Sequence, residues 1–185
     1  MSVERVLNLL GLAGSLRRES HSMAILRGLQ ARLGPDRRLY IGDIRLPLYN
    51  EDEEGHGHPP VIALRREIAA CDGVILATPE YNYGMPGLLK NAIDWASRPY
   101  GASALTGKPV LVISSSLAFT GGVRAHAQLN DALLSLEALL VPGPQAVIGG
   151  VADKVDQGRL VDEASLDFLV ESVERMVAMR RMAPR

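Results

Sequence analysis

Short apolar runs and amphipathic stretches alternate along this chain, and glycines, prolines and polar residues separate them. Continuous apolar runs between turn signals are typical of buried strands, whereas apolar residues that recur every three or four positions are typical of helices. Strands are predicted over residues 6–13, 38–41, 73–78, 110–115 and 145–148. Helices are predicted over residues 22–33, 61–70, 87–97, 124–140 and 163–181.

The alternation of strands with helices predicts an α/β fold, with a parallel sheet covered by helices on both faces. Five strands favour a doubly wound sheet in the order 2-1-3-4-5, whose switch point lies between strands 1 and 3. No internal repeat or linker interrupts the pattern, so residues 1–185 are predicted to form a single domain. In such sheets, ligands bind beyond the carboxyl ends of the strands.

Polar residues follow the third predicted strand at such a position. Pro79 ends the strand, and Glu80, Tyr81 and Asn82 come directly after it, before Gly87 opens the next helix. A plain connection does not need a series of polar side chains like this one. The loop is therefore predicted to contact a ligand.

The loop after the first predicted strand contains residues that suit an anion. Ser15 and Arg17 follow Gly14, and Ser20 and Ser22 lie where the next helix begins. Backbone N–H groups and the helix dipole favour anions at a helix N-terminus, and a guanidinium can bind two phosphate oxygens at once. The alternative is that Ser20 or Ser22 only caps the helix while Arg17 is solvated.

The same loop contains neither of the glycine-rich phosphate motifs G-x-G-x-x-G and G-x-x-x-x-G-K-[ST]. Their absence argues against a dinucleotide site of the Rossmann type and against a P-loop for a triphosphate. A mononucleotide fits what remains, with its phosphate at this loop and its ring system at a later one.

A third loop follows the fourth predicted strand. It begins with serines at residues 114–116, including Ser115, and Gly121 and Gly122 precede the next helix. Small residues allow a flat ligand to approach the backbone, and glycines adopt unusual dihedral angles. Taken alone, the serines indicate a plain turn. Three successive strand ends with loops of this kind favour a ligand site.

Composition narrows the possible functions. A formal net charge of −1 gives no basic surface for nucleic acid, and no apolar run approaches the roughly 20 residues that span a bilayer. No signal-peptide pattern precedes the first strand, so a cytoplasmic protein is expected. Cys71 is the only cysteine, which excludes an internal disulfide and a C-x-x-C redox centre. Any redox chemistry therefore needs a bound cofactor.

Residues 50–60, N-E-D-E-E-G-H-G-H-P-P, raise the possibility of a metal site, since His56 and His58 lie close to four carboxylates in the sequence. Nothing in the spacing defines a tetrahedral ligand set. A solvated acidic loop is the favoured interpretation, and no metal ligand is assigned.

Three motifs together resemble the NADPH-dependent FMN reductase family, which has a flavodoxin-like fold and includes quinone, chromate and azo reductases. They are G-S-L-R at residues 14–17, P-E-Y-N at 79–82 continuing through P-G-L-L-K-N-A-I-D-W at 86–95, and S-S-S at 114–116 with the two following glycines. The segment L-P-L-Y-N at residues 46–50 is also similar to the family. The resemblance extends from residue 6 to about residue 148.

The resemblance implies a site for FMN. The family often has Asn where this chain has Ser22, and serine has the shorter reach toward a phosphate. The implied contacts are Ser15, Arg17, Ser20 and Ser22 for the phosphate, Pro79, Glu80, Tyr81 and Asn82 for the ribityl chain and ring edge, and Ser115, Gly121 and Gly122 for the other side of the ring.

The resemblance also implies an NAD(P)H-dependent FMN reductase or quinone reductase, in which hydride passes from NADPH or NADH through bound FMN to a flavin, quinone or similar acceptor. The flavin would perform the chemistry, so no catalytic side chain is assigned. A homodimer or homotetramer is implied, with Tyr83, Met85 and Trp95 near a partner subunit.

Two alternatives remain open. The first is a flavodoxin-like electron carrier without direct reaction with NAD(P)H, although such a carrier benefits from the strong surface charge that this chain lacks. The second is a doubly wound domain that binds no flavin, because the fold alone does not define a function.

Overall fold

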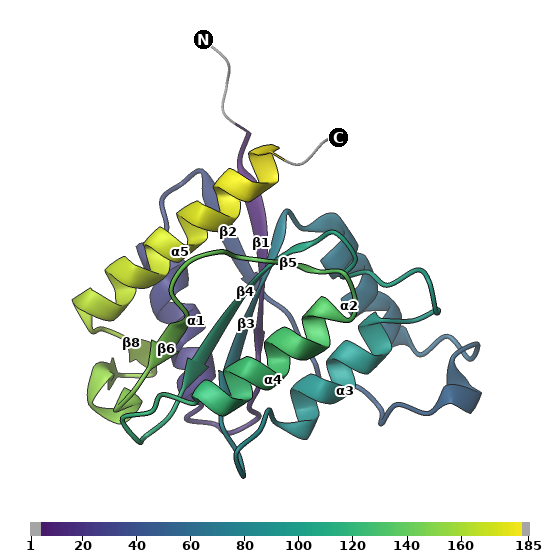
Figure 1. Cartoon of the computed structure of the whole chain (residues 1–185), viewed down its shortest axis with the longest axis horizontal. Coiled ribbons are helices and arrows are strands. Elements are labelled where there is room, and N and C mark those ends of the chain that lie inside the picture. The colour runs from purple at the N-terminus through teal and green to yellow at the C-terminus, as the bar shows by residue number, and fades with distance from the viewer. Residues whose placement is uncertain (1–4, 183–185) are drawn as a thin grey trace.

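The computed structural model describes residues 5–182, which form a twisted parallel sheet between two layers of helices (Figure 1). The sheet order is β2-β1-β3-β4-β5, and the short strand β6 also pairs with β4. This confirms the predicted α/β fold and strand order. The strands are β1 (Leu7–Ala13), β2 (Arg37–Ile41), β3 (Gly73–Pro79), β4 (Pro109–Ser115), β5 (Leu139–Leu140) and β6 (Ala146–Ile148).

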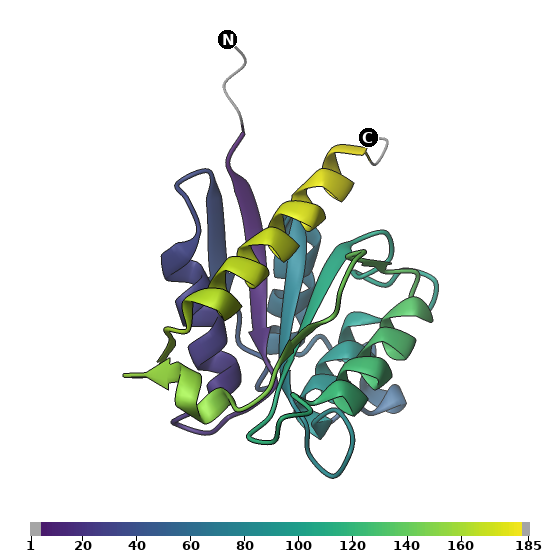
Figure 2. The same ribbon diagram turned by 60° about the vertical axis from the view of Figure 1, so that its left-hand side comes forward.

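The helices pack on the two faces of the sheet, each burying its own apolar cluster. One cluster includes Ile25 of α1 and Leu169 of α5, and the other includes Leu64 of α2, Leu89 of α3 and Leu129 of α4. Figure 2 shows α5 crossing one face, while α3 and α4 lie together on the other. The helices are α1 (His21–Arg32), α2 (Pro59–Ala70), α3 (Gly87–Ala96), α4 (Val123–Leu134) and α5 (Glu163–Met182).

Strands β1 and β3 are neighbours in the sheet, although helix α2 and strand β2 lie between them in the chain. Leu9 of β1 pairs with Gly73, and Ala13 pairs with Ala77. The loops that follow β1, β3 and β4 therefore leave the same edge of the sheet, at the lower side of Figure 1. This is the switch point at which doubly wound sheets bind ligands.

Helix α4 ends at Leu134, six residues before the predicted end, and this prediction was wrong. Glu137 adopts a left-handed conformation with φ of 58°, and the N–H groups of Glu137 and Ala138 donate to the carbonyls of Leu134 and Leu133. This pattern is a Schellman motif, which usually has glycine at the left-handed position. The sequence has Glu there, so the usual stop signal is absent.

The chain after α4 forms two short strands beside β4 instead of one. Leu139 pairs with Pro109, and Ala146 pairs with Ile113, so β5 and β6 share the fifth position of the sheet. The sequence prediction found only the second of them. It also missed the antiparallel hairpin of β7 (Val155–Asp156) and β8 (Arg159–Leu160), and the short 3-10 helices Glu51–Glu53 and Val151–Lys154.

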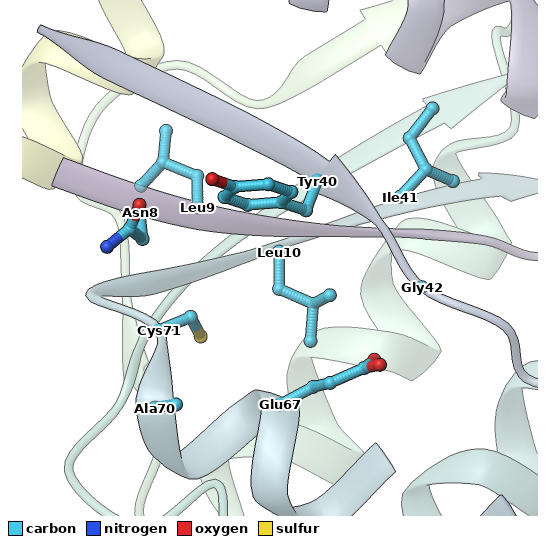
Figure 3. Close-up of a pocket in the computed structure, with 9 residues that line it drawn as sticks. All are labelled: Asn8, Leu9, Leu10, Tyr40, Ile41, Gly42, Glu67, Ala70 and Cys71. Carbon is cyan, nitrogen blue, oxygen red and sulfur yellow. The ribbon is translucent and has the colours of Figure 1, made fainter. Parts of the chain in front are cut away.

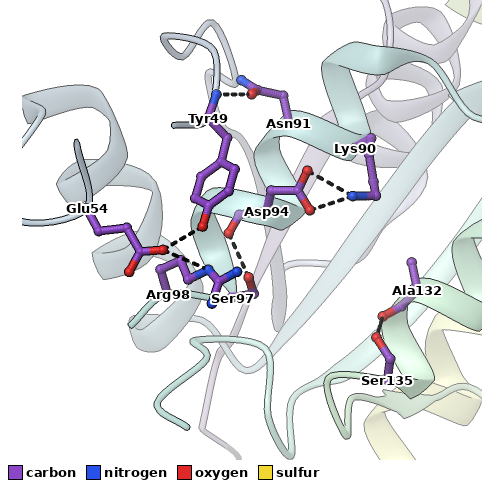
Figure 4. Close-up of polar contacts among 9 residues, drawn as sticks. All are labelled: Tyr49, Glu54, Lys90, Asn91, Asp94, Ser97, Arg98, Ala132 and Ser135. Carbon is purple, nitrogen blue, oxygen red and sulfur yellow. Dashed lines mark hydrogen bonds and ion pairs between the residues drawn. The ribbon is translucent and has the colours of Figure 1, made fainter. Parts of the chain in front are cut away.

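The long connection after β2 is fastened to α3 by side chains of the K-N-A-I-D-W segment. Asn91 accepts a hydrogen bond from the Tyr49 N–H at 2.8 Å and donates to the Pro47 carbonyl at 2.9 Å. The Tyr49 hydroxyl and Arg98 both bind Glu54 (Figure 4). Two segments that resembled the family separately, residues 46–50 and 90–95, are thus in contact.

Trp95 also belongs to this packing. Its indole N–H donates to the Pro47 carbonyl at 2.9 Å, and only 2% of the residue is exposed. The expectation that Trp95 meets a partner subunit was therefore wrong, because its surface is covered within its own chain. Tyr83, by contrast, is 74% exposed.

Candidate functional site

Three loops meet at the carboxyl ends of β1, β3 and β4 and enclose a cavity of about 330 Å³. The first loop leads into the N-terminus of α1, the second into α3 and the third into α4. The cavity is lined by Ser15, Arg17, Ser20, His21, Ser22, Pro79, Glu80, Tyr81, Ser115, Ser116, Leu117, Ala118 and Val151.

The first loop is tied to the sheet at Gly14. Its N–H donates to the Ala77 carbonyl at 2.8 Å, and a Cβ added there would lie 2.5 Å from Leu89 Cδ1. Only glycine allows the backbone to come this close to β3 and α3. At the other end of the loop, Ser20 caps α1, since its hydroxyl accepts a hydrogen bond from the Met23 N–H at 3.2 Å.

Ser22 presents a buried hydroxyl that its own chain does not satisfy. The residue is 1% exposed, and within residues 5–182 its Oγ has no hydrogen-bond partner. Leaving a buried hydroxyl unpaired costs about 1–3 kcal/mol, so such groups usually have a partner. Because Ser22 lines the cavity at the N-terminus of α1, a ligand oxygen can supply that partner.

Two groups create a positive electrostatic potential around the Ser22 hydroxyl, namely the N-terminus of α1 and the guanidinium of Arg17. The first turn of α1 contains no acidic residue, so the positive end of the helix dipole is not neutralised there. Arg17 lines the cavity, is exposed, and makes no ion pair with any residue in the described range. A bound anion is the chemistry that this end of the cavity suits.

The second loop turns sharply between Tyr81 and Gly84. Each of these two residues donates its N–H to the carbonyl of the other, both at 3.0 Å. Asn82 and Tyr83 between them adopt left-handed conformations, with φ of 49° and 65°. Two positive φ angles define the tight turn of a two-residue hairpin. The Tyr81 hydroxyl lies 3.3 Å from Ser15 Oγ, which connects the second loop to the first.

Glu80 fastens the second loop to α4. Its carboxylate accepts hydrogen bonds from the N–H groups of Arg124 at 2.9 Å and Ala125 at 3.3 Å, and it pairs with the Arg124 guanidinium at 3.1 Å. The N-cap residue of α4 is Gly122, which has no side chain for this purpose. Glu80 therefore caps a helix more than 40 residues further along the chain.

The third loop requires its glycines for steric reasons. Gly121 and Gly122 have φ of 62° and 83°, in the region that favours glycine. A Cβ on Gly121 would lie 2.3 Å from Val147 Cγ1, and one on Gly122 would lie 3.2 Å from the Ser115 carbonyl oxygen. These contacts pack the loop against β4 and β6 and position Ser115 at the cavity.

The model that defines the NADPH-dependent FMN reductase family matches residues 7–153 of this chain. The match covers most of the sequence and contains all three loops. The chain belongs to the NADPH-dependent FMN reductase family.

Relatives across this family are similar over nearly their whole length. An NAD(P)H-dependent FMN reductase of Pseudomonas aeruginosa is 36% identical over 173 residues, covering 92% of this chain and 93% of the relative. A quinone reductase of Pseudomonas putida is 39% identical over 172 residues, covering 90% and 91%. The solved structure of FerB, a flavoenzyme NAD(P)H:(acceptor) oxidoreductase from Paracoccus denitrificans, has a TM-score of 0.87 at 34% identity, covering 96% and 98%.

Membership of the NADPH-dependent FMN reductase family makes this chain an oxidoreductase with FMN as cofactor and NAD(P)H as co-substrate. The cavity fits such a cofactor at its phosphate end. The unpaired Ser22 hydroxyl, the uncompensated guanidinium of Arg17 and the N-terminus of α1 are all donors or positive groups, as a phosphate monoester requires.

Eight of the eleven residues expected to contact FMN line this one cavity. Asn82, Gly121 and Gly122 lie in the same loops but outside the lining. The cavity is also lined by five residues that were not predicted as contacts, namely His21, Ser116, Leu117, Ala118 and Val151. His21 lies between Ser20 and Ser22, so the same serine-rich helix start that predicted those two residues also indicated His21. Val151 follows β6, and nothing near it in the sequence indicates a ligand.

A different cavity, of about 390 Å³, lies beside the edge strand β2 and under α2 (Figure 3). Its walls are mostly apolar, and Tyr40, Leu10 and Cys71 contribute to them. Glu67 is the charged residue in the lining, so an anionic cofactor is disfavoured there. Burial raises the pKa of the Cys71 thiol, which makes it a poor nucleophile.

The acidic connection between β2 and α2 forms no cluster suited to a metal. His58 Nε2 lies 2.8 Å from Glu53, but residues 5–182 contain no group of three or more His, Cys, Asp or Glu side chains that could hold an ion.

No helix within residues 5–182 is long and apolar enough to cross a membrane.

Proposed function

We propose that this chain binds FMN in the cavity between its three loops and transfers hydride from NAD(P)H to a quinone or flavin acceptor. The observation that supports this assignment best is the buried, unpartnered Ser22 hydroxyl beside Arg17 at the N-terminus of α1. A quinone is the favoured acceptor, because a relative that is 39% identical is named a quinone reductase.

Each loop has its own part in this proposal. Ser15, Arg17, Ser20 and Ser22 hold the phosphate, and the rigid turn at Tyr81 and Asn82 lies along the ribityl chain and ring edge. Ser115, Gly121 and Gly122 form the opposite wall. Glu80 acts indirectly, because its carboxylate is already engaged by α4 and keeps the second loop in place.

Bound FMN would supply the hydride-transfer chemistry between NAD(P)H and the acceptor. The protein contributes binding and orientation, and the dipole of α1 together with Arg17 offsets the phosphate charge. Hydride transfer from NAD(P)H takes no proton from the protein, and water at the open cavity supplies the one proton that completes reduction of a quinone to a hydroquinone, so we assign no catalytic acid or base.

The exposed apolar groups around α3 support an oligomer, as proposed from the resemblance. Leu48, Tyr83 and Tyr100 are largely exposed, and the side chains of Tyr83 and Arg124 stack with 4.2 Å between the guanidinium carbon and the ring centroid. We propose a homodimer or homotetramer, located in the cytoplasm where NAD(P)H is available. Light scattering during size-exclusion chromatography measures the number of subunits.

Anaerobic stopped-flow mixing of the FMN-loaded protein with NADPH tests the function. Rapid bleaching of the flavin absorbance, followed by recovery on adding a quinone, is expected. Flavin that neither NADPH nor NADH bleaches would instead indicate an electron carrier. The variant Arg17→Ala is expected to retain less FMN, and unchanged flavin content would exclude its phosphate role.

A further inference from the structure

A second polar cavity, of about 390 Å³, adjoins the flavin cavity on the β2 side of the first loop. Ser15 and Arg17 line both cavities, so the two spaces share a wall. The remaining lining comes from the ends of β1 and β2, the first loop, α1 and the segment after β2. It consists of Ala13, Leu16, Arg18, Met23, Arg27, Ile41, Gly42, Asp43, Ile44 and Arg45.

Arginines dominate the charge of this cavity. Arg17, Arg18, Arg27 and Arg45 all line it, and Asp43 is the one carboxylate among the lining residues. The Arg45 Nε donates to the two oxygens of Asp43 at 2.9 and 3.0 Å, and this contact lowers the pKa of Asp43. The ion pair of Arg45 and Asp43 therefore has no net charge.

The other three guanidiniums are not compensated. Arg17, Arg18 and Arg27 make no ion pair with any residue of the described part of the chain, so the cavity has an excess of three positive charges. The whole chain has a net charge of −1, so this excess is a local feature. Like charges this close repel one another, and a polyanionic ligand relieves the repulsion.

We propose that this cavity binds the 2′-phosphate of NADPH through Arg18 and Arg27, and that the chain therefore prefers NADPH to NADH. The inference rests on the proposed function, because it concerns the co-substrate of the same reaction. NADPH and NADH differ only in this phosphate, and guanidinium is the side-chain group best matched to a phosphate dianion.

The position of the cavity supports this assignment. Ser20, His21 and Ser22 line the flavin cavity and not this one, so the FMN phosphate has its own donors. Arg18 and Arg27 line only the second cavity and remain available for a second phosphate. The shared wall at Arg17 keeps an adenosine phosphate bound here next to the flavin cavity.

The double variant Arg18→Gln/Arg27→Gln tests the proposal, with Arg66→Gln on α2 as the control for loss of a surface arginine. Calorimetry with 2′,5′-ADP and with 5′-AMP isolates the 2′-phosphate without any turnover. The native protein is expected to bind 2′,5′-ADP more tightly than AMP. The double variant should weaken 2′,5′-ADP binding about tenfold or more, as expected for losing charge-assisted hydrogen bonds.

Kinetics of the FMN-loaded enzyme provides a second readout. In the double variant, KM for NADPH should rise by a similar factor, while kcat and KM for NADH stay near their native values. The control variant should leave both nucleotides unaffected. If the double variant does not fold, the single variant Arg18→Gln, on the exposed loop, replaces it. A smaller rise in KM for NADPH is then expected.

Three results would overturn the proposal. Equal affinity of the native protein for 2′,5′-ADP and AMP would remove the 2′-phosphate site. Loss of FMN from the double variant would show that the arginines hold the flavin phosphate, and a raised KM for the quinone alone would assign them to the acceptor. If neither nucleotide reduces the flavin, the proposed function fails, whereas the calorimetric comparison still decides whether the phosphate site exists.

Discussion

Glu80 and Arg124 are joined by two contacts, one to the backbone and one to the side chain. The Glu80 carboxylate accepts a hydrogen bond from the Arg124 N–H at 2.9 Å and pairs with its guanidinium at 3.1 Å. The first contact caps a helix and the second is an ion pair at the surface of the molecule. Through them, the loop after β3, which lines the candidate flavin site, is fastened to the helix after β4.

Glu80→Ala should destabilise the protein by about 1–2 kcal/mol, the usual cost of losing a helix cap. The free second loop should also weaken FMN binding. Arg124→Ala is the matched control, since it keeps the backbone N–H that Glu80 caps and removes only the contacts of a half-exposed guanidinium with Glu80 and Tyr83, so it should cost less than about 1 kcal/mol. Urea denaturation measures both variants, and an equal loss in the two would contradict the capping role.

Ser22→Ala should separate ligand binding from stability. The hydroxyl has no partner in residues 5–182, so the flavin-free variant should be at least as stable as the native protein, because it loses no hydrogen bond and no longer buries an unpaired hydroxyl. Its FMN dissociation constant should rise about tenfold, because a hydrogen bond to a charged phosphate is lost. Fluorescence titration with FMN measures the change.

Ser20→Ala serves as the comparison for that experiment. Ser20 caps α1, so its removal should lower the stability of the flavin-free protein by about 1 kcal/mol in addition to any effect on FMN. If Ser22→Ala destabilised the flavin-free protein to the same extent, its hydroxyl would have a structural partner and the phosphate assignment would lose its main support.

Gly121→Ala should cost about 3 kcal/mol, because the new Cβ would lie 2.3 Å from Val147 Cγ1 in a backbone with φ of 62°. Gly107→Ala has a similar φ of 68° but nothing within 4 Å of the added Cβ, so it should cost only about 1 kcal/mol. Thermal unfolding of the two variants separates steric overlap from backbone strain. Similar losses would mean that the third loop can move away from β6.

Acid should destabilise the fold through His126. Burial lowers the pKa of this imidazole to about 4 from its ordinary value of 6.5. The unfolded chain therefore binds a proton that the folded chain rejects between these pH values. The contribution of the neutral imidazole to the free energy of unfolding is complete above pH 6.5. It is lost as the pH falls toward 4, by up to about 1.4 kcal/mol per pH unit.

The variant His126→Gln removes that titration. Carboxylates also titrate in this range, so the informative quantity is the difference between the native protein and the variant. Between pH 7 and pH 5, the free energy of unfolding should fall less in the variant, as measured by urea denaturation. Identical pH dependence in the two proteins would place the His126 pKa near its ordinary value.

The sequence was sufficient to predict the sheet order and the three ligand-type loops. Buried parallel strands require continuous apolar runs, and helices that cover a sheet require apolar residues at every third or fourth position. Both patterns involve neighbouring residues only, so they can be recognised in the sequence. The edge at which Gly14, Pro79 and Ser115 lie follows from that topology, because parallel strands end on the same side. Eight of the expected contacts therefore line one cavity.

Only the tertiary structure decided the roles of several residues within those loops. Glu80 lines the cavity, and its carboxylate caps α4, because Gly122 leaves that helix without a side-chain cap. Helix α4 stops at Leu134 because Glu137 accepts a left-handed conformation that local sequence signals assign to glycine. Arg27 and Asp43 meet in a cavity although 16 positions separate them. Local patterns define elements, whereas capping partners and charge clusters depend on which elements pack together.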